Sequence, residues 1–176
     1  MKHGKGLVGA ALLLYVSLHP AHAVTGVAVE GGKDGADMAR VGIQWDWKHR
    51  WFEGHEWHLG GYWDLALGYW KRNSVLGLNE DITEIGLTPV FRLQRNELKG
   101  AYLEAGIGAH LLSRTSLDIK RFSTMFQFGE HIGAGYRFGA RGALDLGYRF
   151  QHLSNCDIKQ PNSGINFHQI RLQYHY

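Results

Sequence analysis

Apolar and polar residues alternate along most of the chain after its first 23 residues. From Leu144 to Phe150, every second residue is Leu, Leu, Tyr or Phe, and those between are Asp, Gly and Arg. Such alternation is typical of a β-strand with one apolar and one polar face. The pattern predicts eight strands, which we place at 24–30, 39–47, 59–70, 84–93, 102–111, 126–138, 144–154 and 166–176.

The length of these strands and the position of their charges indicate a membrane barrel. Most run for about 10 to 14 residues, whereas strands of soluble sheets usually have about five or six. The charged residues fall opposite the apolar parity: Glu84, Arg92, Glu104, Arg137, Asp145, Arg149 and Arg171. An even-numbered transmembrane barrel can pair such charges inside while lipid contacts its apolar exterior. We therefore predict an all-β fold, an eight-stranded antiparallel β-barrel of the outer membrane.

Aromatic residues support the same fold. We expect the six Trp residues (Trp45, Trp47, Trp51, Trp57, Trp63 and Trp70) and many Tyr residues to form girdles at the membrane interfaces. The alternative is a soluble, lipocalin-like barrel, in which the apolar parity would face inward and the charges outward. The long strands and the alternating C-terminus that ends at Tyr176 favour the membrane barrel.

The first 23 residues have the three parts of a secretory signal peptide. Lys2 and Lys5 precede an apolar run from Leu7 to Leu18, and Ala21-His22-Ala23 provides small residues for cleavage. The run is too short for a membrane-spanning helix. We expect a signal peptide at 1–23 and a single barrel domain at 24–176 of a Gram-negative outer-membrane protein, inserted by the barrel assembly machinery.

Charge and cysteine content narrow the functional classes further. The formal net charge of +3 is scattered, with no run of Lys or Arg, which argues against a nucleic-acid partner. A single cysteine, Cys156, excludes an intrachain disulfide. The prediction includes no cofactor and no metal ligand, and it leaves open whether the protein is a monomer or a homodimer.

Three polar residues lie on the apolar parity of the last two strands. His152 and Ser154 continue the parity of Leu144 and Phe150, and Asn166 shares the parity of Ile170 in the next strand. Serine becomes a nucleophile when a base such as histidine takes its proton, and a third group can orient the imidazole. In an even barrel whose termini are periplasmic, these residues reach the outer leaflet, where the ester bonds of lipid A lie. We predict a catalytic site of His152, Ser154 and Asn166.

The residues around this site resemble the active-site motif of the PagL family of lipid A 3-O-deacylases. His152-Leu-Ser154-Asn155 is followed by Lys159-Gln160-Pro161-Asn162 and Gly164. The resemblance extends over the mature chain, for example at Trp45-Asp46-Trp47 and Glu104-Ala105-Gly106-Ile107-Gly108. It implies an outer-membrane barrel that hydrolyses the 3-position acyl ester of lipid A with Ser154 as nucleophile and His152 as general base. It also implies an oxyanion hole of the Cys156 and Asp157 amides and Asn162, with Asn155, Pro161 and Gly164 supporting the motif.

One position departs from the family pattern, which has Glu where this chain has Asn166. The outer-membrane phospholipase A family is similar to this chain at that point, because its site combines Ser, His and Asn. An esterase that acts on another acyl ester, such as that of a phospholipid, is therefore an alternative, and a non-catalytic barrel of the OmpA/OmpX type is another. His168 is an alternative third member of the site. Basic residues of the outer loops are candidates for contact with lipid A phosphates: Lys71, Arg72, Arg114, Lys120, Arg121 and Lys159.

Overall fold

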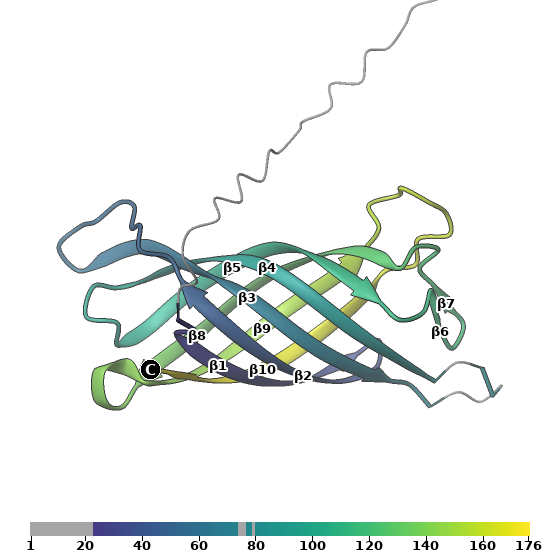
Figure 1. The fold of residues 1–176 in the computed structure, drawn as a ribbon, viewed down its shortest axis with the longest axis horizontal. Helices are drawn as coiled ribbons and strands as arrows, with labels where there is room; N and C mark the ends of the chain where they lie inside the picture. Colours follow the sequence, from purple (N-terminus) through teal and green to yellow (C-terminus); the bar gives the residue numbers. More distant parts are fainter. Residues whose placement is uncertain (1–22, 74–76, 79) are drawn as a thin grey trace, which may run out of the picture.

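A computed structural model describes residues 23–73, 77–78 and 80–176. The predicted signal peptide lies outside these residues, apart from Ala23. In the described part of the chain, eight strands close into one antiparallel barrel in the order β1-β10-β9-β8-β5-β4-β3-β2 (Figure 1). The strands are β1 Gly26–Asp34, β2 Asp37–Asp46, β3 Trp57–Lys71, β4 Asp81–Arg95, β5 Gly100–Leu112, β8 Phe126–Phe138, β9 Leu144–Ser154 and β10 Ile165–His175. The predicted fold is confirmed.

Three short elements, all absent from the sequence prediction, complete the described fold. β6 (Ser116–Leu117) and β7 (Lys120–Arg121) form a hairpin in the connection between β5 and β8, and η1 (Ala140–Gly142) is a single 3-10 turn before β9. No helix in the described ranges is long and apolar enough to cross a membrane.

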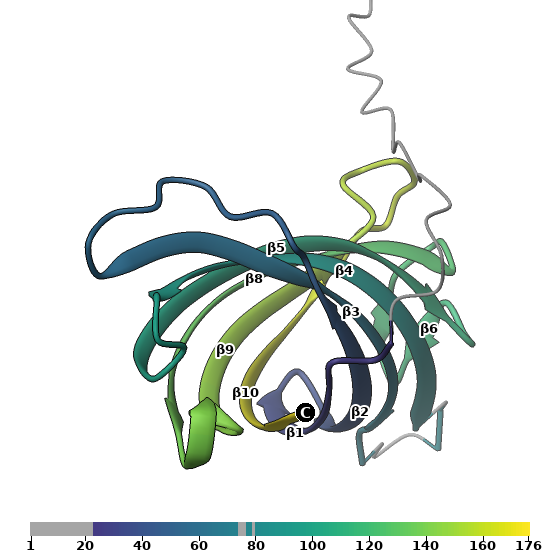
Figure 2. The ribbon, with the colours of Figure 1, turned by 60° about the vertical axis from the view of Figure 1, so that its left-hand side comes forward.

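The two ends of the barrel differ in what they carry. β1 pairs with β10, with Gly26 opposite His175, so the start of the barrel and the C-terminus lie at one end (Figures 1 and 2). The β6–β7 hairpin and the β9–β10 connection lie at the opposite end. We call this opposite end, formed in the described ranges by residues 35–36, 72–73, 77–78, 80, 113–125 and 155–164, the loop end.

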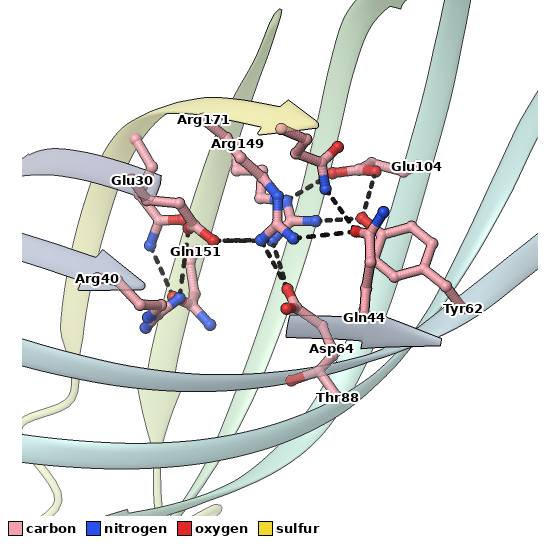
Figure 3. A network of polar contacts seen from close by, with 12 residues as sticks. Glu30, Arg40, Gln44, Tyr62, Asp64, Thr88, Glu104, Arg149, Gln151 and Arg171 are labelled. Atoms are coloured by element: carbon pink, nitrogen blue, oxygen red, sulfur yellow. Dashed lines mark hydrogen bonds and ion pairs between the residues drawn. The ribbon is translucent and has the colours of Figure 1, made fainter. Parts of the chain in front are cut away.

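The interior of the barrel is filled with paired charges. Arg92 lies 2.7 Å from both Glu104 and Asp145, and Arg40 lies 2.8 Å from Glu84. Figure 3 shows the side chains of Glu30, Asp64, Glu104, Arg149 and Arg171 directed toward one another from different strands. Because every one of these charges has an opposite partner within reach, the interior can hold them away from water. The outward parity is apolar, for example Val29, Leu103 and Ile132, which excludes the lipocalin-like alternative.

Toward the loop end the inward-facing residues change from charged to apolar. They form a cluster that we call the apolar plug: Ala36, Met38, Trp70, Ile82, Leu112, Leu117, Phe122, Leu153, Ile165 and Phe167. Leu117 and Phe122 reach it from the β6–β7 hairpin and its flank, and both are fully buried. The plug anchors that hairpin onto the end of the barrel and packs beneath the ends of β9 and β10.

The prediction for Trp70 is wrong. Its side chain is buried in the apolar plug against Phe122 and Phe167 rather than lying in an interfacial girdle. Trp70 lies on the inward parity of β3, and no pattern within this strand reveals that the inward parity turns apolar near the strand end. Trp47, Trp51 and Trp63 do cluster with Phe91 at the end of the barrel where β1 begins and β10 ends.

Candidate active site

His152 and Ser154 lie on the outer face of the barrel, as their parity predicts. They are residues of β9 separated by Leu153, which is fully buried in the apolar plug. Successive side chains of a strand point to opposite faces, so burial of Leu153 turns both neighbours outward. His152 is partly exposed, and Ser154, the last residue of β9, is 8% exposed. The plug therefore fixes which way the two candidate catalytic groups face.

Asn166 contacts His152 across the β9–β10 pair. The two residues stand directly opposite each other in the register, and His152 Nδ1 lies 2.5 Å from Asn166 Oδ1. An amide oxygen can only accept, so this contact requires a proton on Nδ1. The neutral imidazole then carries its lone pair on Nε2, the nitrogen that a neighbouring serine needs as its base.

Ser154 lies beside this imidazole without a hydrogen bond to it in the described structure. Residues i and i+2 of a strand share a face, with Cα atoms about 7 Å apart. A rotation of the serine and histidine side chains can bring such a pair together, and catalytic hydrogen bonds often tighten only when substrate is bound. The structure thus brings His152 and Asn166 into contact and holds Ser154 next to them.

Asn155 anchors the loop that follows Ser154. Its fully buried side-chain amide donates to the carbonyl oxygens of Phe122 and Lys159, both at 2.8 Å. Its backbone amide donates to Asn162 Oδ1 at 3.1 Å. One asparagine therefore connects the strand end, both arms of the β9–β10 loop and the segment after β7. This contact set explains the place of Asn155 in the motif.

Cys156 and Asp157 form a tight turn next to Ser154. Their φ angles are 51° and 61°, and Ile158 N donates to Asn155 O at 3.1 Å across the turn. Positive φ at two successive central residues is the geometry of a type I′ turn. In the described structure neither central amide donates a backbone hydrogen bond, so both remain available as donors. This is the arrangement expected for the predicted oxyanion hole.

Asn162 is held in place by both ends of its side chain. Its Oδ1 accepts from Asn155 N, and its Nδ2 donates to Asp157 Oδ1 at 3.1 Å. Asp157 also accepts from Gln160 Nε2 at 2.8 Å. An amide nitrogen carries two protons, so Asn162 keeps one donor for a third partner. The loop is thus held in shape by contacts among its own side chains.

Gly164 makes room for the imidazole of His152. Its φ is +55°, and a Cβ at this position would lie 2.8 Å from His152 Cε1 and 3.2 Å from Nε2. Both the conformation and the space favour glycine. Its carbonyl oxygen accepts from Lys120 Nζ at 3.2 Å. The imidazole therefore lies between Asn166 on one side and the backbone at Gly164 on another.

The connection between β5 and β8 supports the β9–β10 loop at several points. Ser123 Oγ donates to Pro161 O at 2.7 Å, and Ser163 N donates to Arg121 O at 3.2 Å. Together with the contact of Asn155 to Phe122, these bonds tie the β9–β10 loop to a segment that the apolar plug holds in place. Of the basic residues predicted at the outer loops, Arg72 pairs with Asp118 and Arg114 with Asp81.

The other histidines are not part of this group. His168 is exposed on the outer face, as predicted, but its Nδ1 lies 2.6 Å from the hydroxyl of Tyr148, so it is not the partner of His152. His58 is buried inside the barrel and contacts Asn96 and Gln94. In the described ranges no group of three or more His, Cys, Asp or Glu side chains is arranged to hold a metal ion.

Glu130 belongs to the surroundings of the site and was missed in the sequence. It lies on the apolar parity of β8, between Phe128 and Ile132, and stands opposite His152 in the register. An acidic residue on an otherwise apolar strand face is the same signal that revealed His152 and Ser154. It could have been found by extending the parity test to every strand.

Residues 37–175 match the family described as Lipid A 3-O-deacylase (PagL). The chain belongs to this family. It is 31% identical over 171 residues to the lipid A deacylase PagL of Pseudomonas aeruginosa, covering 97% of this chain and 96% of the relative. It is also 34% identical over 125 residues to lipid A deacylase PagL of Bordetella bronchiseptica, covering 67% of each.

A solved structure extends the match to three dimensions. The crystal structure of the outer membrane enzyme PagL superposes with a TM-score of 0.74 at 28% identity, covering 88% of this chain and all of that chain. Membership of the PagL family confirms the predicted resemblance and the prediction that the chain is an ester hydrolase. It argues against the alternative of a non-catalytic barrel of the OmpA/OmpX type.

Proposed function

We propose that this chain is an outer-membrane serine esterase that removes the acyl chain from the 3-position of lipid A. The observation that carries the proposal is the contact of 2.5 Å between His152 Nδ1 and Asn166 Oδ1 on the outer face of the barrel. A polar group facing lipid is costly, and a contact that fixes the imidazole tautomer beside a serine gives it a chemical purpose. The names of the relatives supply the substrate class.

In the first half of the reaction, Ser154 attacks the ester carbonyl. His152 Nε2 takes the proton from Ser154 Oγ as the new C–O bond forms, and the imidazolium keeps its other proton directed at Asn166. The negative oxygen of the tetrahedral intermediate is stabilised by the backbone amides of Cys156 and Asp157 and by the second N–H of the Asn162 side chain. Collapse breaks the bond to the sugar oxygen, which takes the proton from His152 and leaves as the 3-hydroxyl.

In the second half, water releases the acyl chain. His152 Nε2 takes a proton from water, whose oxygen attacks the acyl carbon bound to Ser154. The second tetrahedral intermediate collapses with return of the proton to Ser154 Oγ. The products are a free fatty acid and a lipid A with one acyl chain fewer.

The location of the site fits this substrate. We infer that the signal peptide at 1–23 is removed during export and that the barrel assembly machinery inserts the barrel with both termini in the periplasm. The loop end then lies at the outer surface, where Ser154 meets the boundary between sugar headgroup and acyl chains. The apolar exterior and the likeness to an outer membrane enzyme support this placement. Fractionation of expressing cells, with the protein found in the outer membrane, tests it.

Mass spectrometry of lipid A from expressing Gram-negative cells tests the activity. We expect lipid A to lose the mass of one hydroxyacyl chain in cells with the wild-type chain and to remain intact with Ser154→Ala. Ser163→Ala is the matched control, because Ser163 is an exposed serine of the same loop, and its hydrogen bond to Arg121 O is made by its backbone amide. Identical spectra for wild type and Ser154→Ala contradict the proposal.

A phospholipid esterase is the second candidate, favoured by one observation. Asn166 stands where the PagL pattern has Glu, and it makes the contact to His152 that a Ser-His-Asn site requires. Mass spectrometry of the phospholipids from the same cells distinguishes the two substrates. Formation of lysophospholipid with intact lipid A supports the second candidate and contradicts the first.

A further inference from the structure

Glu130 and His152 are neighbours in the strand register on the outer face of the barrel. Glu130 is exposed and stands opposite His152 in the β8–β9 register. Its neighbour on the other side is Ile107 of β5, and its neighbours along β8 are Phe128 and Ile132. His152 is therefore the polar neighbour that the fold gives to Glu130.

This carboxylate has no structural partner that explains it. None of the ion pairs of the described residues includes Glu130. The other outward-facing carboxylates of the described strands, Asp37 and Asp81, are the first residues of their strands, whereas Glu130 lies inside β8. Acidic residues on a lipid-facing strand surface reduce barrel stability, more so with depth.

In the proposed mechanism the positive charge that develops on His152 is not balanced by Asn166. During the reaction its imidazole becomes a cation, and a neutral amide orients that cation without neutralising it. Asn166, His152 and Glu130 form one row across β10, β9 and β8. Neighbours on one face of an antiparallel pair have Cβ atoms about 4.5–5.5 Å apart, within reach of a glutamate side chain.

We infer that Glu130 stabilises the protonated form of His152 during catalysis and so provides the negative charge that Asn166 lacks. The inference rests on the proposed function of His152 as general base. Glu130 acts through His152 and does not touch the reacting atoms, so it is a positioning residue. In this chain the work of orienting the imidazole and the work of neutralising it are divided between the two strands that flank β9.

The other charged groups near the ring do not fill this role. On the β6–β7 side, Lys120 is a cation whose ammonium group contacts the carbonyl of Gly164. In the β9–β10 loop, the Asp157 carboxylate accepts from Gln160 and Asn162. On β10, His168 is hydrogen-bonded to Tyr148, away from Asn166.

Glu130→Gln in the purified, detergent-folded protein tests the inference. The substitution keeps the shape and removes the charge, so we expect kcat on lipid A to fall about tenfold. Without the carboxylate the imidazolium loses a stabilising charge, so the low-pH loss of activity should move to lower pH. Glu130→Asp should restore most of the rate. Glu97→Gln, an exposed carboxylate in the turn after β4, is the control and should match wild type.

A second substitution distinguishes charge compensation from a structural role. Asn166→Glu puts a carboxylate on the other side of His152, so Glu130→Gln should then cost less than about twofold. The inference is overturned if wild type is active and Glu130→Gln leaves kcat and the low-pH limb unchanged, raises KM alone, or costs the same in both backgrounds. A wild-type protein inactive on lipid A contradicts the proposed function instead.

Discussion

Asn166 Oδ1 lies 2.5 Å from His152 Nδ1, and this contact joins β10 to β9 on the lipid-facing surface. It selects the tautomer in which Nε2 is free to accept the proton of Ser154. Removal of the amide leaves the serine and histidine in place but lets the ring turn. In the proposed mechanism the third member of the site therefore orients the imidazole, whereas Ser154 forms the bond to the acyl carbon.

Asn166→Ala should lower the turnover of lipid A by about 10- to 100-fold, much less than the loss of about 10⁴-fold or more expected for Ser154→Ala. Asn166→Glu should retain or raise activity, because a carboxylate both orients and stabilises the imidazolium. Rates on purified lipid A measure these effects, with folding checked by heat-modifiable gel mobility. Full activity of folded Asn166→Ala means that the three-residue assignment is wrong.

Acidification should abolish activity while the barrel stays folded. His152 accepts the serine proton only in its neutral form, so turnover is full where the imidazole is neutral and declines as protonation removes the Nε2 lone pair. The measurement is the pH dependence of kcat in detergent, with β-structure followed by circular dichroism at each pH. A rate that stays constant from roughly pH 5 to 8 argues against His152 as the base.

Gly164→Ala should damage the site and spare the barrel. The added Cβ lies 2.8 Å from His152 Cε1, at a residue whose φ of +55° disfavours alanine. The ring must shift away from its contact with Asn166, so we expect kcat to fall by about 10- to 100-fold. Gly77→Ala is the control, since that glycine also has positive φ but no atom within 4 Å of the added Cβ. Equal activity of the two variants excludes the steric explanation.

Arg92→Met should destabilise the barrel as a whole. Arg92 pairs with Glu104 and Asp145 at 2.7 Å and is almost fully buried, so its loss leaves two carboxylates short of a partner. Removing one partner of a buried ion pair typically costs about 3–5 kcal/mol. Urea unfolding in detergent or bilayers measures the change, and the exposed Arg95→Met provides the comparison. A loss below about 1 kcal/mol for Arg92→Met indicates that the network compensates for the missing charge.

Much of the fold was predictable because lipid enforces alternation. A shift of one residue in strand register would place Arg149 or Glu104 in hydrocarbon. The alternation in the sequence must therefore specify which face of each strand contacts lipid. The same rule predicted that His152, Ser154 and Asn166 share the outer face. Asn166 and His152 could be brought together from sequence because a short loop joins their strands.

The parts that sequence did not predict depend on contacts between distant segments. Trp70 and Phe122 meet in the apolar plug although about fifty residues separate them. The alternation pattern around each residue does not indicate which distant residue it contacts. The hydrogen bond from the Asn155 side chain to the carbonyl of Phe122 also joins segments that are far apart in the sequence. Glu130 lies beside His152 because of the register between β8 and β9. To predict that register from sequence, the exact ends of both strands and the length of the turn between them must be known.

Hydrolysis of purified lipid A by the wild type, Ser154→Ala and Ser163→Ala in detergent tests the central claim most directly. The account predicts that wild type and Ser163→Ala release the 3-position hydroxyacyl chain at similar rates, leaving a free 3-hydroxyl located by tandem mass spectrometry. Ser154→Ala, folded by gel mobility, should release none above background. Release by Ser154→Ala at the wild-type rate, or loss of a chain from another position, contradicts the account.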